Sequence, residues 1–324
     1  MALLQVDNLT VELSVPGGWI KALDNFSLRI DYGSYHGIIG ESGSGKSIAM
    51  LAIMGLLDNK AKVYADRISL KDEDLLAMSE ERRRQTLYQY ASIIFQEPRH
   101  SLNPCFKIKD QIDETLFVHG YSNEDVRNKR CEELLSDVGI TGIDTILRSY
   151  PHQLTAGILQ RITIAIALAS DPELLIADEP TTELSPTDQT QIMQLLNDLV
   201  KKRNMAMILI SHDLKLLRDN TDYISIMYCS QVIESGKKEY IFSNPRHPYT
   251  RSILASSPLN WKLDPKSKVP SLKGSTPSLH HLPVGCYLGP RCPHAEARCV
   301  QPPKPLFENN YMIRCHFPGG KAND

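Results

Sequence analysis

No stretch of the sequence reaches the roughly 18 to 20 consecutive apolar residues that a helix needs to cross a bilayer. The densest apolar stretches, residues 162–169 and 205–210, have the length of buried helix turns or strands. The N-terminus has neither a basic start nor a long apolar core, so it does not predict a signal peptide. From these absences we expect a protein that stays in the cytoplasm and acts at a membrane only through a partner.

The sequence also lacks an excess of charge of one sign. Its 36 basic and 38 acidic residues leave a formal net charge of −2, which gives no electrostatic reason to expect nucleic acid as the main partner. No internal repeat is visible. With 324 residues, the chain is long enough for one large or two modest domains with buried cores.

The first 30 residues alternate apolar and polar positions on either side of Gly17 and Gly18. This pattern predicts two antiparallel strands joined by a turn. A strand at residues 35–39 is followed by a glycine-rich turn and an apolar helix from Lys46 to about Leu57.

Farther along, residues 108–169 are mostly helical in pattern, and apolar strands at 174–177 and 205–210 flank a helix at 187–202. Continuous apolar strands separated by helices predict an α/β fold with a parallel sheet covered on both faces. Beyond about Pro245 prolines recur and periodicity fades, so we place a domain boundary near Asn244.

A glycine-rich segment between the predicted strand and helix matches G-x4-G-K-[ST], the pattern of a phosphate-binding loop. Glycines let backbone N–H groups converge on phosphate oxygens, and the helix N-terminus adds its partial positive charge. The lysine reaches the β- and γ-phosphates, and the final hydroxyl binds Mg²⁺. The residues predicted to bind the nucleotide are Gly40, Glu41, Ser42, Gly43, Ser44, Gly45, Lys46 and Ser47, of which Lys46 is also catalytic and Ser47 also a magnesium ligand.

Two carboxylates, Asp178 and Glu179, end the apolar strand of residues 174–177. A strand can deliver them to the carboxyl edge of the sheet, where α/β folds bind ligands. We expect Asp178 to hold Mg²⁺ through its water shell and Glu179 to polarise the attacking water. Without other motifs, these two carboxylates would be explained as solvated charges at the end of a strand. Because the sequence also contains a phosphate-binding loop, a role at the nucleotide is favoured.

Between these two motifs, residues 154–161 read L-T-A-G-I-L-Q-R. This segment resembles the signature of the ABC ATPases, L-S-G-G-Q or L-S-G-G-M-x-Q-R. Two further residues fall in family order: Gln96 in I-I-F-Q-E-P matches the Q-loop, and His212 in I-L-I-S-H-D matches the switch histidine. The resemblance covers roughly residues 3–240.

The resemblance implies a P-loop NTPase with an antiparallel β subdomain, a helical subdomain at about 108–170 and a small cysteine-containing C-terminal region. The ABC ATPase domain would span 1–244 and the C-terminal region 245–324. It also implies ATP and Mg²⁺ as cofactors, Gln96 as a ligand of Mg²⁺ and nucleotide, and His212 as a catalytic residue. Thr155, Ala156 and Gly157 would contact nucleotide through the signature. Trp19 is a candidate for stacking on adenine or for ordinary packing in the hairpin.

The branch of the family is indicated by S-L-N-P at residues 101–104 and H-P-Y-T at residues 247–250. Together with the C-terminal cysteines, these motifs look like the oligopeptide/dipeptide importers. Residues 289–293, G-P-R-C-P, and the altered signature are most like the branch named for sensitivity to antimicrobial peptides, the Sap D type.

Family organisation implies partners. Two ATPase domains face each other head to tail, and each ATP lies between one domain's phosphate loop and the other's signature. This chain has one of each, so we expect a second ABC ATPase subunit, two transmembrane permease subunits and, indirectly, a substrate-binding protein. The chain would then lie at the cytoplasmic face of the inner membrane.

Two departures from the family favour a heterodimer. The signature's serine and first glycine are Thr155 and Ala156, and the aspartate of the following D-loop is Ser185. Ala156 adds a methyl group where backbone normally approaches phosphate. Because these residues serve the ATP on the partner's phosphate loop, we expect that opposite site to be weakened and this chain's own site to be competent.

Four cysteines, Cys286, Cys292, Cys299 and Cys315, follow the spacing C-x5-C-x6-C-x15-C. Four thiolates gathered from loops suit tetrahedral zinc or an iron–sulfur cluster. No C-x2-C pair is present, and some members of the resembling branch carry a [4Fe–4S] cluster on such cysteines, so we favour the cluster over zinc, with free thiols as the alternative.

Three other functions compete with peptide transport. In the first, the chain energises a transporter whose cargo is a polyamine, nickel or haem instead of a peptide. In the second, it is an ABC ATPase that acts on DNA or the ribosome. In the third, it is a regulatory subunit that does not hydrolyse ATP. The second usually needs two cassettes or a coiled-coil insertion, which are not seen in the sequence, and Glu179 and His212 argue against the third.

Overall fold

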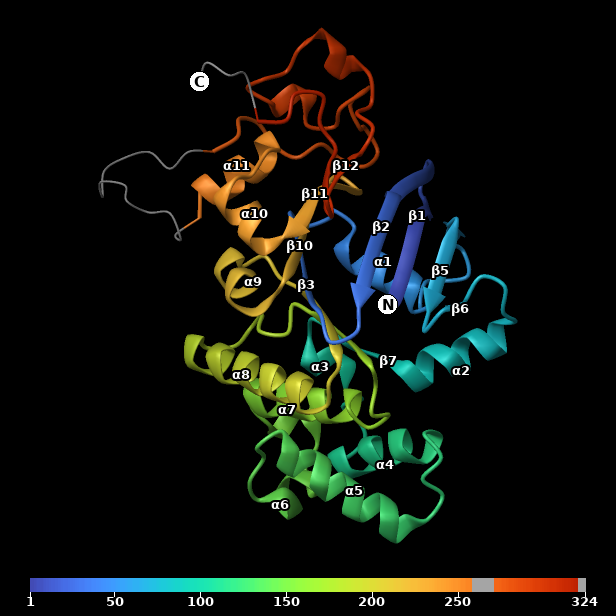
Figure 1. Cartoon of the computed structure of the whole chain (residues 1–324). Helices are drawn as coiled ribbons and strands as arrows, with labels where there is room; N and C mark the ends of the chain where they lie inside the picture. The colour runs from blue at the N-terminus through green and yellow to red at the C-terminus, as the bar shows by residue number, and fades with distance from the viewer. Residues whose placement is uncertain (258–270, 320–324) are drawn as a thin grey trace. The chain divides into compact units, whose positions relative to one another are not determined.

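The computed structural model describes residues 1–257 and 271–319, and contacts within the chain define two compact units (Figure 1). Unit 1 comprises Met1, Asp31–Ser34 and Ala77–Ile208. Unit 2 comprises Ala2–Ile30, Tyr35–Leu76 and the described residues from Leu209 onward. Within both described ranges, every helix is too short or too polar to span a lipid bilayer.

Unit 2 begins with a sheet in the order β2-β1-β5-β6, with β4 also paired to β1. β1 and β2 are long neighbouring strands joined by the predicted turn at Gly17 and Gly18. β4 and β5 both pair antiparallel with β1. The strands are β1 (Ala2–Val15), β2 (Gly18–Asp31), β4 (Lys62–Tyr64), β5 (Arg67–Leu70) and β6 (Glu73–Asp74).

The remaining strands of unit 2 follow the order β12-β13-β11-β10-β3. β3 and β10 are parallel, whereas β10, β11, β13 and β12 are successively antiparallel. The strands are β3 (Tyr35–Gly40), β10 (Tyr223–Tyr228), β11 (Gln231–Lys237), β12 (Leu306–Glu308) and β13 (Tyr311–Ile313). The helices are α1 (Lys46–Ile53), α9 (Leu214–Asn220), α10 (Lys238–Ser243), α11 (Pro248–Ala255), η3 (Gly289–Arg291) and η4 (Ala297–Val300).

Unit 1 contains strands in the order β9-β8-β7, and β7 and β8 are parallel. Its strands are β7 (Ala91–Ile94), β8 (Leu174–Asp178) and β9 (Ala206–Ile210), and the chain passes into unit 2 within β9. Its helices are α2 (Glu80–Tyr90), α3 (Pro98–Ser101), α4 (Ile108–Val118), α5 (Glu124–Asp137), α6 (Ile143–Arg148), η1 (Pro151–Gln153), α7 (Ala156–Ala167) and α8 (Pro186–Lys202).

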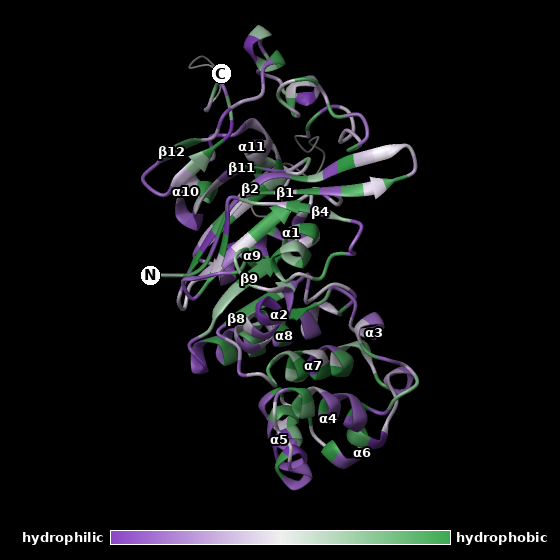
Figure 2. Ribbon diagram, turned by 90° about the vertical axis from the view of Figure 1, so that its right-hand side faces the viewer, coloured by the Kyte–Doolittle hydropathy of each residue, from purple (hydrophilic) through white to green (hydrophobic). Residues whose placement is uncertain are grey.

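Burial follows the hydrophobic patterns of the chain. Every residue of β8 and β9 is buried, as expected for strands covered on both faces. The second half of β2 instead alternates buried and more exposed positions. Apolar colour runs along most of α7 in Figure 2, and this helix buries Leu159, Ile162 and Ile164. The core of each unit is therefore built from the segments that the sequence marks as apolar.

Polar side chains fix where several helices begin. Ser79, Asn123 and Ser185 precede α2, α5 and α8, and their side chains accept hydrogen bonds from backbone N–H groups of the first turn. These groups have no partner inside the helix, so such caps stabilise each helix by about 1 kcal/mol.

A buried carboxylate ties the start of α11 to β11 and β13. Glu234, fully buried on β11, accepts hydrogen bonds from the backbone N–H groups of Arg246, at 2.7 Å, and His247, at 3.2 Å. The Tyr311 hydroxyl of β13 donates to the same carboxylate. His247 caps α11 by accepting from the Tyr249 N–H at 3.1 Å. The H-P-Y-T motif thus shapes the junction between the sheet and the C-terminal region.

Most predicted elements are confirmed, with two corrections. The helix predicted from Lys46 to about Leu57 ends at Ile53, because Gly55 adopts φ 66° and the N–H groups of Gly55 and Leu56 bond back to the last turn. The predicted parallel sheet has parallel pairs, but the strands after β10 are antiparallel, and two of them come from the C-terminal region. The domain boundary near Asn244 stays a prediction.

Two buried histidines make the stability of the fold sensitive to acid. Burial lowers the pKa of His36 to about 4 and that of His247 to about 3, whereas an unfolded histidine titrates near pH 6.5. Below pH 6.5 the unfolded chain therefore binds more protons than the folded chain. The histidines' contribution to stability is present above pH 6.5 and is lost as the pH falls toward the folded values.

We expect the urea midpoint of unfolding to fall between pH 6.5 and pH 4, and to fall less in the His247→Asn variant. Asparagine is a good helix cap that does not titrate in this range. His100→Asn, which changes a histidine whose side chain is 82% exposed, should follow the parent chain. An identical pH dependence in parent and His247→Asn would contradict the prediction.

Candidate active site

The predicted ATP-site residues are divided between the two units. The phosphate loop and His212 belong to unit 2. Gln96, the signature, Asp178 and Glu179 belong to unit 1.

In unit 2, the phosphate loop connects β3 to α1 and leaves no space for side chains at two of its glycines. A Cβ atom on Gly40 would lie 2.5 Å from the Met227 carbonyl oxygen and 2.5 Å from Ser44 Oγ. Gly45 adopts φ 99°, and a Cβ atom there would lie 2.7 Å from the Ala22 carbonyl oxygen. Glycine is therefore required at both positions, because the neighbouring backbone already occupies the space of a side chain.

The Lys46 ammonium lies across this loop. Its Nζ donates to the Gly40 carbonyl oxygen at 2.8 Å and to the Glu41 carbonyl oxygen at 3.1 Å, and the residue is 7% exposed. A buried ammonium is costly unless such partners surround it. The loop therefore holds its cation where an anion entering the cradle would meet it.

His212, the predicted switch residue, lies between β9 and α9, in a connection fixed at both ends. The Ser211 N–H donates to the Ile38 carbonyl oxygen of β3 at 3.2 Å. Asp213 caps α9, and its N–H donates to Ser211 Oγ at 3.0 Å. A cavity of about 620 Å³ brings His212 together with the phosphate loop and α11. Its lining includes Gly40, Glu41, His212, Tyr249, Ser252 and Arg291.

In unit 1, strand pairing places Gln96 beside Glu179. The parallel register opposes Ile94 of β7 to Ala177 of β8, and each functional residue follows two positions later. Gln96 Nε2 donates to Glu179 Oε2 at 3.1 Å, and Thr182 Oγ1 donates to the same oxygen at 3.1 Å. Glu179 has φ 47°, which turns the chain sharply at the strand end. Two donors thus fix the direction of this carboxylate just after the end of β8.

The predicted signature lies at the N-terminus of α7 and borders a cavity of about 200 Å³. The opposite wall is the segment that takes the place of the D-loop, where Ser185 Oγ donates to Asp188 Oδ2 at 2.7 Å and caps α8. The lining residues are Thr155, Ala156, Gly157, Ile158, Arg161, Glu183, Leu184, Ser185, Asp188 and Ile192. The charged lining therefore consists of two carboxylates, Glu183 and Asp188, and one guanidinium, Arg161.

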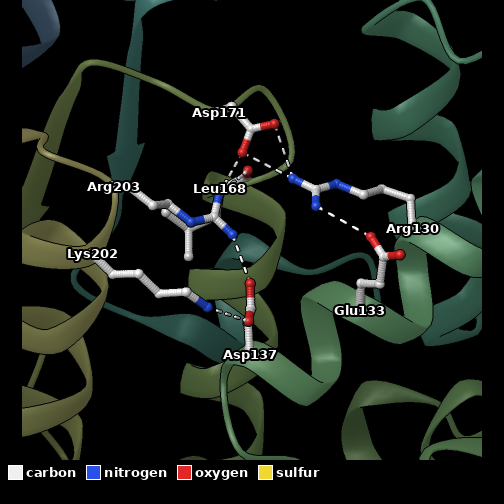
Figure 3. A network of polar contacts seen from close by, with 7 residues as sticks. All are labelled: Arg130, Glu133, Asp137, Leu168, Asp171, Lys202 and Arg203. Atoms are coloured by element: carbon white, nitrogen blue, oxygen red, sulfur yellow. Dashed lines mark hydrogen bonds and ion pairs between the residues drawn. The ribbon is translucent and has the colours of Figure 1, made fainter.

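A charged network holds the far end of the signature helix (Figure 3). Arg203 donates to Asp171 at 2.6 Å, to Asp137 at 2.9 Å and to the Leu168 carbonyl oxygen at 3.3 Å. Arg130 donates to both carboxylate oxygens of Asp171 at 2.9 Å. The network joins the ends of α5, α7 and α8 to the loop before β8. It therefore fixes the signature helix and the strand that carries Asp178 at their common end.

The four C-terminal cysteines line one small cavity in unit 2. Burial raises the pKa of the Cys286, Cys292 and Cys315 thiols, that of Cys315 to about 11, so they are neutral at physiological pH. His294 and His316 border the same cavity. In the described parts of the chain, however, no three His, Cys, Asp or Glu side chains are arranged to hold a metal ion.

Two contacts of the phosphate loop were not predicted. Thr276 and Arg291, both from the C-terminal region, contact the Glu41 carboxylate. The only signal in the sequence was that Arg291 lies inside the P-R-C-P motif. Trp19, the adenine candidate, is 48% exposed, and the Lys62 ammonium lies 3.9 Å from its ring centroid.

Comparison with known proteins adds independent findings. Residues 23–182 match the family model described as ABC transporter, and residues 233–299 match that described as oligopeptide/dipeptide transporter, C-terminal region. The chain is 43% identical to the dipeptide transport ATP-binding protein DppD of Escherichia coli over 98% of this chain and 97% of that protein. It is 40% identical to the peptide transport system ATP-binding protein SapD of Salmonella typhimurium over 98% of both chains.

Among solved structures, a dimeric post-hydrolysis state of the ATP-binding cassette MJ0796 bound to ADP and Pi matches with a TM-score of 0.64 and 27% identity. The match covers 72% of this chain and 98% of that one.

Proposed function

The chain belongs to the ATP-binding subunits of ABC transporters that carry the oligopeptide/dipeptide C-terminal region, and on this premise we propose that it energises the uptake of peptides across a membrane. As a member of this family it is an ATPase that uses ATP and Mg²⁺, with hydrolysis coupled to transport. The observation that carries the proposal is similarity to peptide-transport ATPases along 98% of the chain.

Each unit supplies part of the ATP chemistry. In unit 2, the loop of residues 40–47 would bind the phosphates, with Lys46 and the backbone N–H groups as donors and Ser47 as a ligand of Mg²⁺. The buried Ser44 Oγ has no hydrogen-bond partner within the described residues, and a phosphate oxygen would satisfy it. His212, which shares a cavity with this loop, would act as the switch residue.

In unit 1, Glu179 would accept a proton from the attacking water. The hydrogen bonds from Gln96 and Thr182 support this role because they fix the direction of the carboxylate. Asp178, buried at the end of β8, would hold Mg²⁺ through water, with Gln96 as a further ligand.

We also propose that the functional ATPase is a heterodimer. One chain carries one phosphate loop and one signature, and the solved cassette MJ0796 is dimeric. The signature cavity supports asymmetry because it contains Ala156 in place of glycine, Ser185 as a helix cap and two acidic side chains. The second subunit would supply an unaltered signature to this chain's phosphate loop, while the opposite site would be weak.

The transmembrane partners would dock near residues 96–104. Phe95 and Phe106, on either side of this segment, are 41% and 54% exposed, and exposed aromatic side chains favour protein contacts. Two permease subunits would receive the chain there and hold it at the cytoplasmic face of the membrane, with a substrate-binding protein acting indirectly. The identities to DppD and SapD are similar, so a Sap-type antimicrobial cargo stays a prediction.

The Glu179→Gln variant tests the proposed catalytic base. We expect ATP turnover by the assembled transporter to fall about 100-fold or more while ATP still binds, because glutamine keeps the shape but cannot accept a proton. Turnover is measured as phosphate release, with Glu132→Gln as a control that changes an exposed carboxylate of α5. Retention of most of the rate in Glu179→Gln would refute this assignment.

Gentle solubilisation of native membranes that contain a tagged chain tests the partners. We expect two multi-span proteins and a second ATPase with an L-S-G-G-Q signature to co-purify, as mass spectrometry would identify. Recovery of the chain alone, or with nucleic acid, would remove the transporter proposal and favour the regulatory or DNA-acting alternatives.

Finally, we propose that the cysteine cavity holds a [4Fe–4S] cluster. Cys286, Cys292, Cys299 and Cys315 gather around one space, which supports a four-thiolate site. Burial raises the pKa of the Cys286, Cys292 and Cys315 thiols and favours their protonated form. The positive charge of bound iron would favour the thiolate form instead. Ligation would require these side chains to move, because within residues 1–257 and 271–319 no three His, Cys, Asp or Glu side chains are arranged to hold a metal ion.

Anaerobic purification tests the cluster. We expect a brown protein that contains about four irons and four acid-labile sulfides per chain, and we expect a Cys299→Ser variant to lose iron. Cys105→Ser, which changes an exposed cysteine elsewhere, serves as the control. A colourless preparation without iron would remove the proposal, and stoichiometric zinc would replace it.

A further inference from the structure

The phosphate loop carries an acidic side chain at its second position. Glu41 follows Gly40 directly, and its side chain is 36% exposed. A carboxylate beside a site built for polyphosphate repels the ligand, since two like charges a few ångströms apart interact unfavourably even near the protein surface. Something in the protein must offset this charge if the loop is to bind ATP.

The C-terminal region supplies the compensating groups within unit 2. Thr276 Oγ1 donates to Glu41 Oε2, and Arg291 Nη1 lies 3.6 Å from Glu41 Oε1. The same Arg291 nitrogen donates to Thr276 Oγ1 at 3.2 Å, which closes a triangle of contacts around the carboxylate. The Arg291 side chain is only 12% exposed, so solvent screens its charge less than that of a surface arginine.

Arg291 is itself held in place from several sides. Its Nη1 donates to the Tyr228 hydroxyl at 3.2 Å, and the guanidinium carbon lies 5.8 Å from the centroid of the same ring. Its Nε donates to the Lys273 carbonyl oxygen at 3.2 Å. The backbone of Arg291 ends η3, and Cys292 of the cysteine cavity follows. A guanidinium held at this many points loses little further entropy when it binds a carboxylate.

We propose that Arg291 and Thr276 are positioning residues for the phosphate loop. They hold the Glu41 carboxylate in one direction and neutralise it, and thereby set the affinity of the loop for the triphosphate. The C-terminal region is then part of the nucleotide site rather than a separate appendage. This inference rests on the phosphate-binding role proposed for residues 40–47.

Substitution of Arg291 by glutamine in the full-length chain tests the inference. We expect the dissociation constant for ATP, measured by fluorescence of a trinitrophenyl analogue and competition with ATP, to rise about fivefold, the size expected for loss of a partly exposed ion pair. In the assembled transporter, KM should rise with kcat nearly unchanged. Arg291→Lys should recover part of the loss because it restores the positive charge. Arg298→Gln, which removes an exposed arginine of the same region, is the matched control.

A double-mutant cycle with Glu41→Gln separates neutralisation from a merely structural role. If Arg291 acts on the Glu41 charge, Arg291→Gln should change ATP affinity less than twofold in the Glu41→Gln background. Thr276→Val gives a second, milder variant if Arg291→Gln folds poorly, as thermal unfolding would show. Equal weakening in both backgrounds, or no weakening in either, would overturn the inference.

The Lys46→Ala variant distinguishes failure of the proposed phosphate site from failure of the positioning role alone. If Lys46→Ala binds ATP as tightly as the parent chain, residues 40–47 do not bind phosphate and the proposed function fails. If Lys46→Ala loses ATP binding while Arg291→Gln keeps parental affinity, only the positioning role fails.

Discussion

Close packing of neighbouring strands against Gly40 and Gly45 is the constraint on which the predicted phosphate loop depends. No Cβ atom fits at either position, because the carbonyl oxygens of Met227 and Ala22 already occupy the space. Those oxygens belong to β10 and β2, so the strands on both sides are packed against the loop backbone itself. The glycines therefore let the surrounding strands approach closely enough to hold the shape of the loop.

The turn between β10 and β11 also supports the phosphate loop, through hydrogen bonds from Ser230. Cys229 and Ser230 are the two residues of a tight hairpin and adopt φ 43° and φ 70°, values that cost non-glycine residues about 1 kcal/mol each. Hydrogen bonds offset this conformational cost. The Ser230 N–H donates to the Ser44 carbonyl oxygen at 3.1 Å, and Ser230 Oγ donates to the Lys21 carbonyl oxygen at 3.0 Å. Tyr228, the residue before the turn, contacts Arg291. The phosphate loop, the first hairpin and the C-terminal region thus meet around one strained turn.

The sequence predicted what depends on local pattern, and it failed where distant segments meet. Strand β8 and helix α8 were predicted almost residue for residue, because continuous apolar runs and heptad-like spacing report burial directly. The contact between Gln96 and Glu179 was not predicted, because it depends on the parallel pairing of β7 with β8, which the order of the motifs does not reveal. Likewise, Arg291 lies 250 positions from Glu41, and no periodicity or spacing encodes a single ion pair at that separation. The end of α1 was missed although Gly55 was visible, because apolar residues beyond it continued the helical pattern.

Ser185, in the segment that takes the place of the D-loop, has a clear structural role in this chain. Ser185 stands where the resemblance to the ABC ATPases predicts an aspartate, and its hydroxyl caps α8 and donates to Asp188. A cap of this kind is a local, stabilising function that serine performs well and that leaves its hydroxyl committed to its own chain. Glu183 and Asp188 line the cavity beside Ala156, together with Arg161. Glu179, by contrast, accepts hydrogen bonds from Gln96 and Thr182, which fix the direction of its carboxylate. Under the proposed heterodimer, this chain would contribute Glu179 to one nucleotide site and would depend on the second subunit for an unaltered signature.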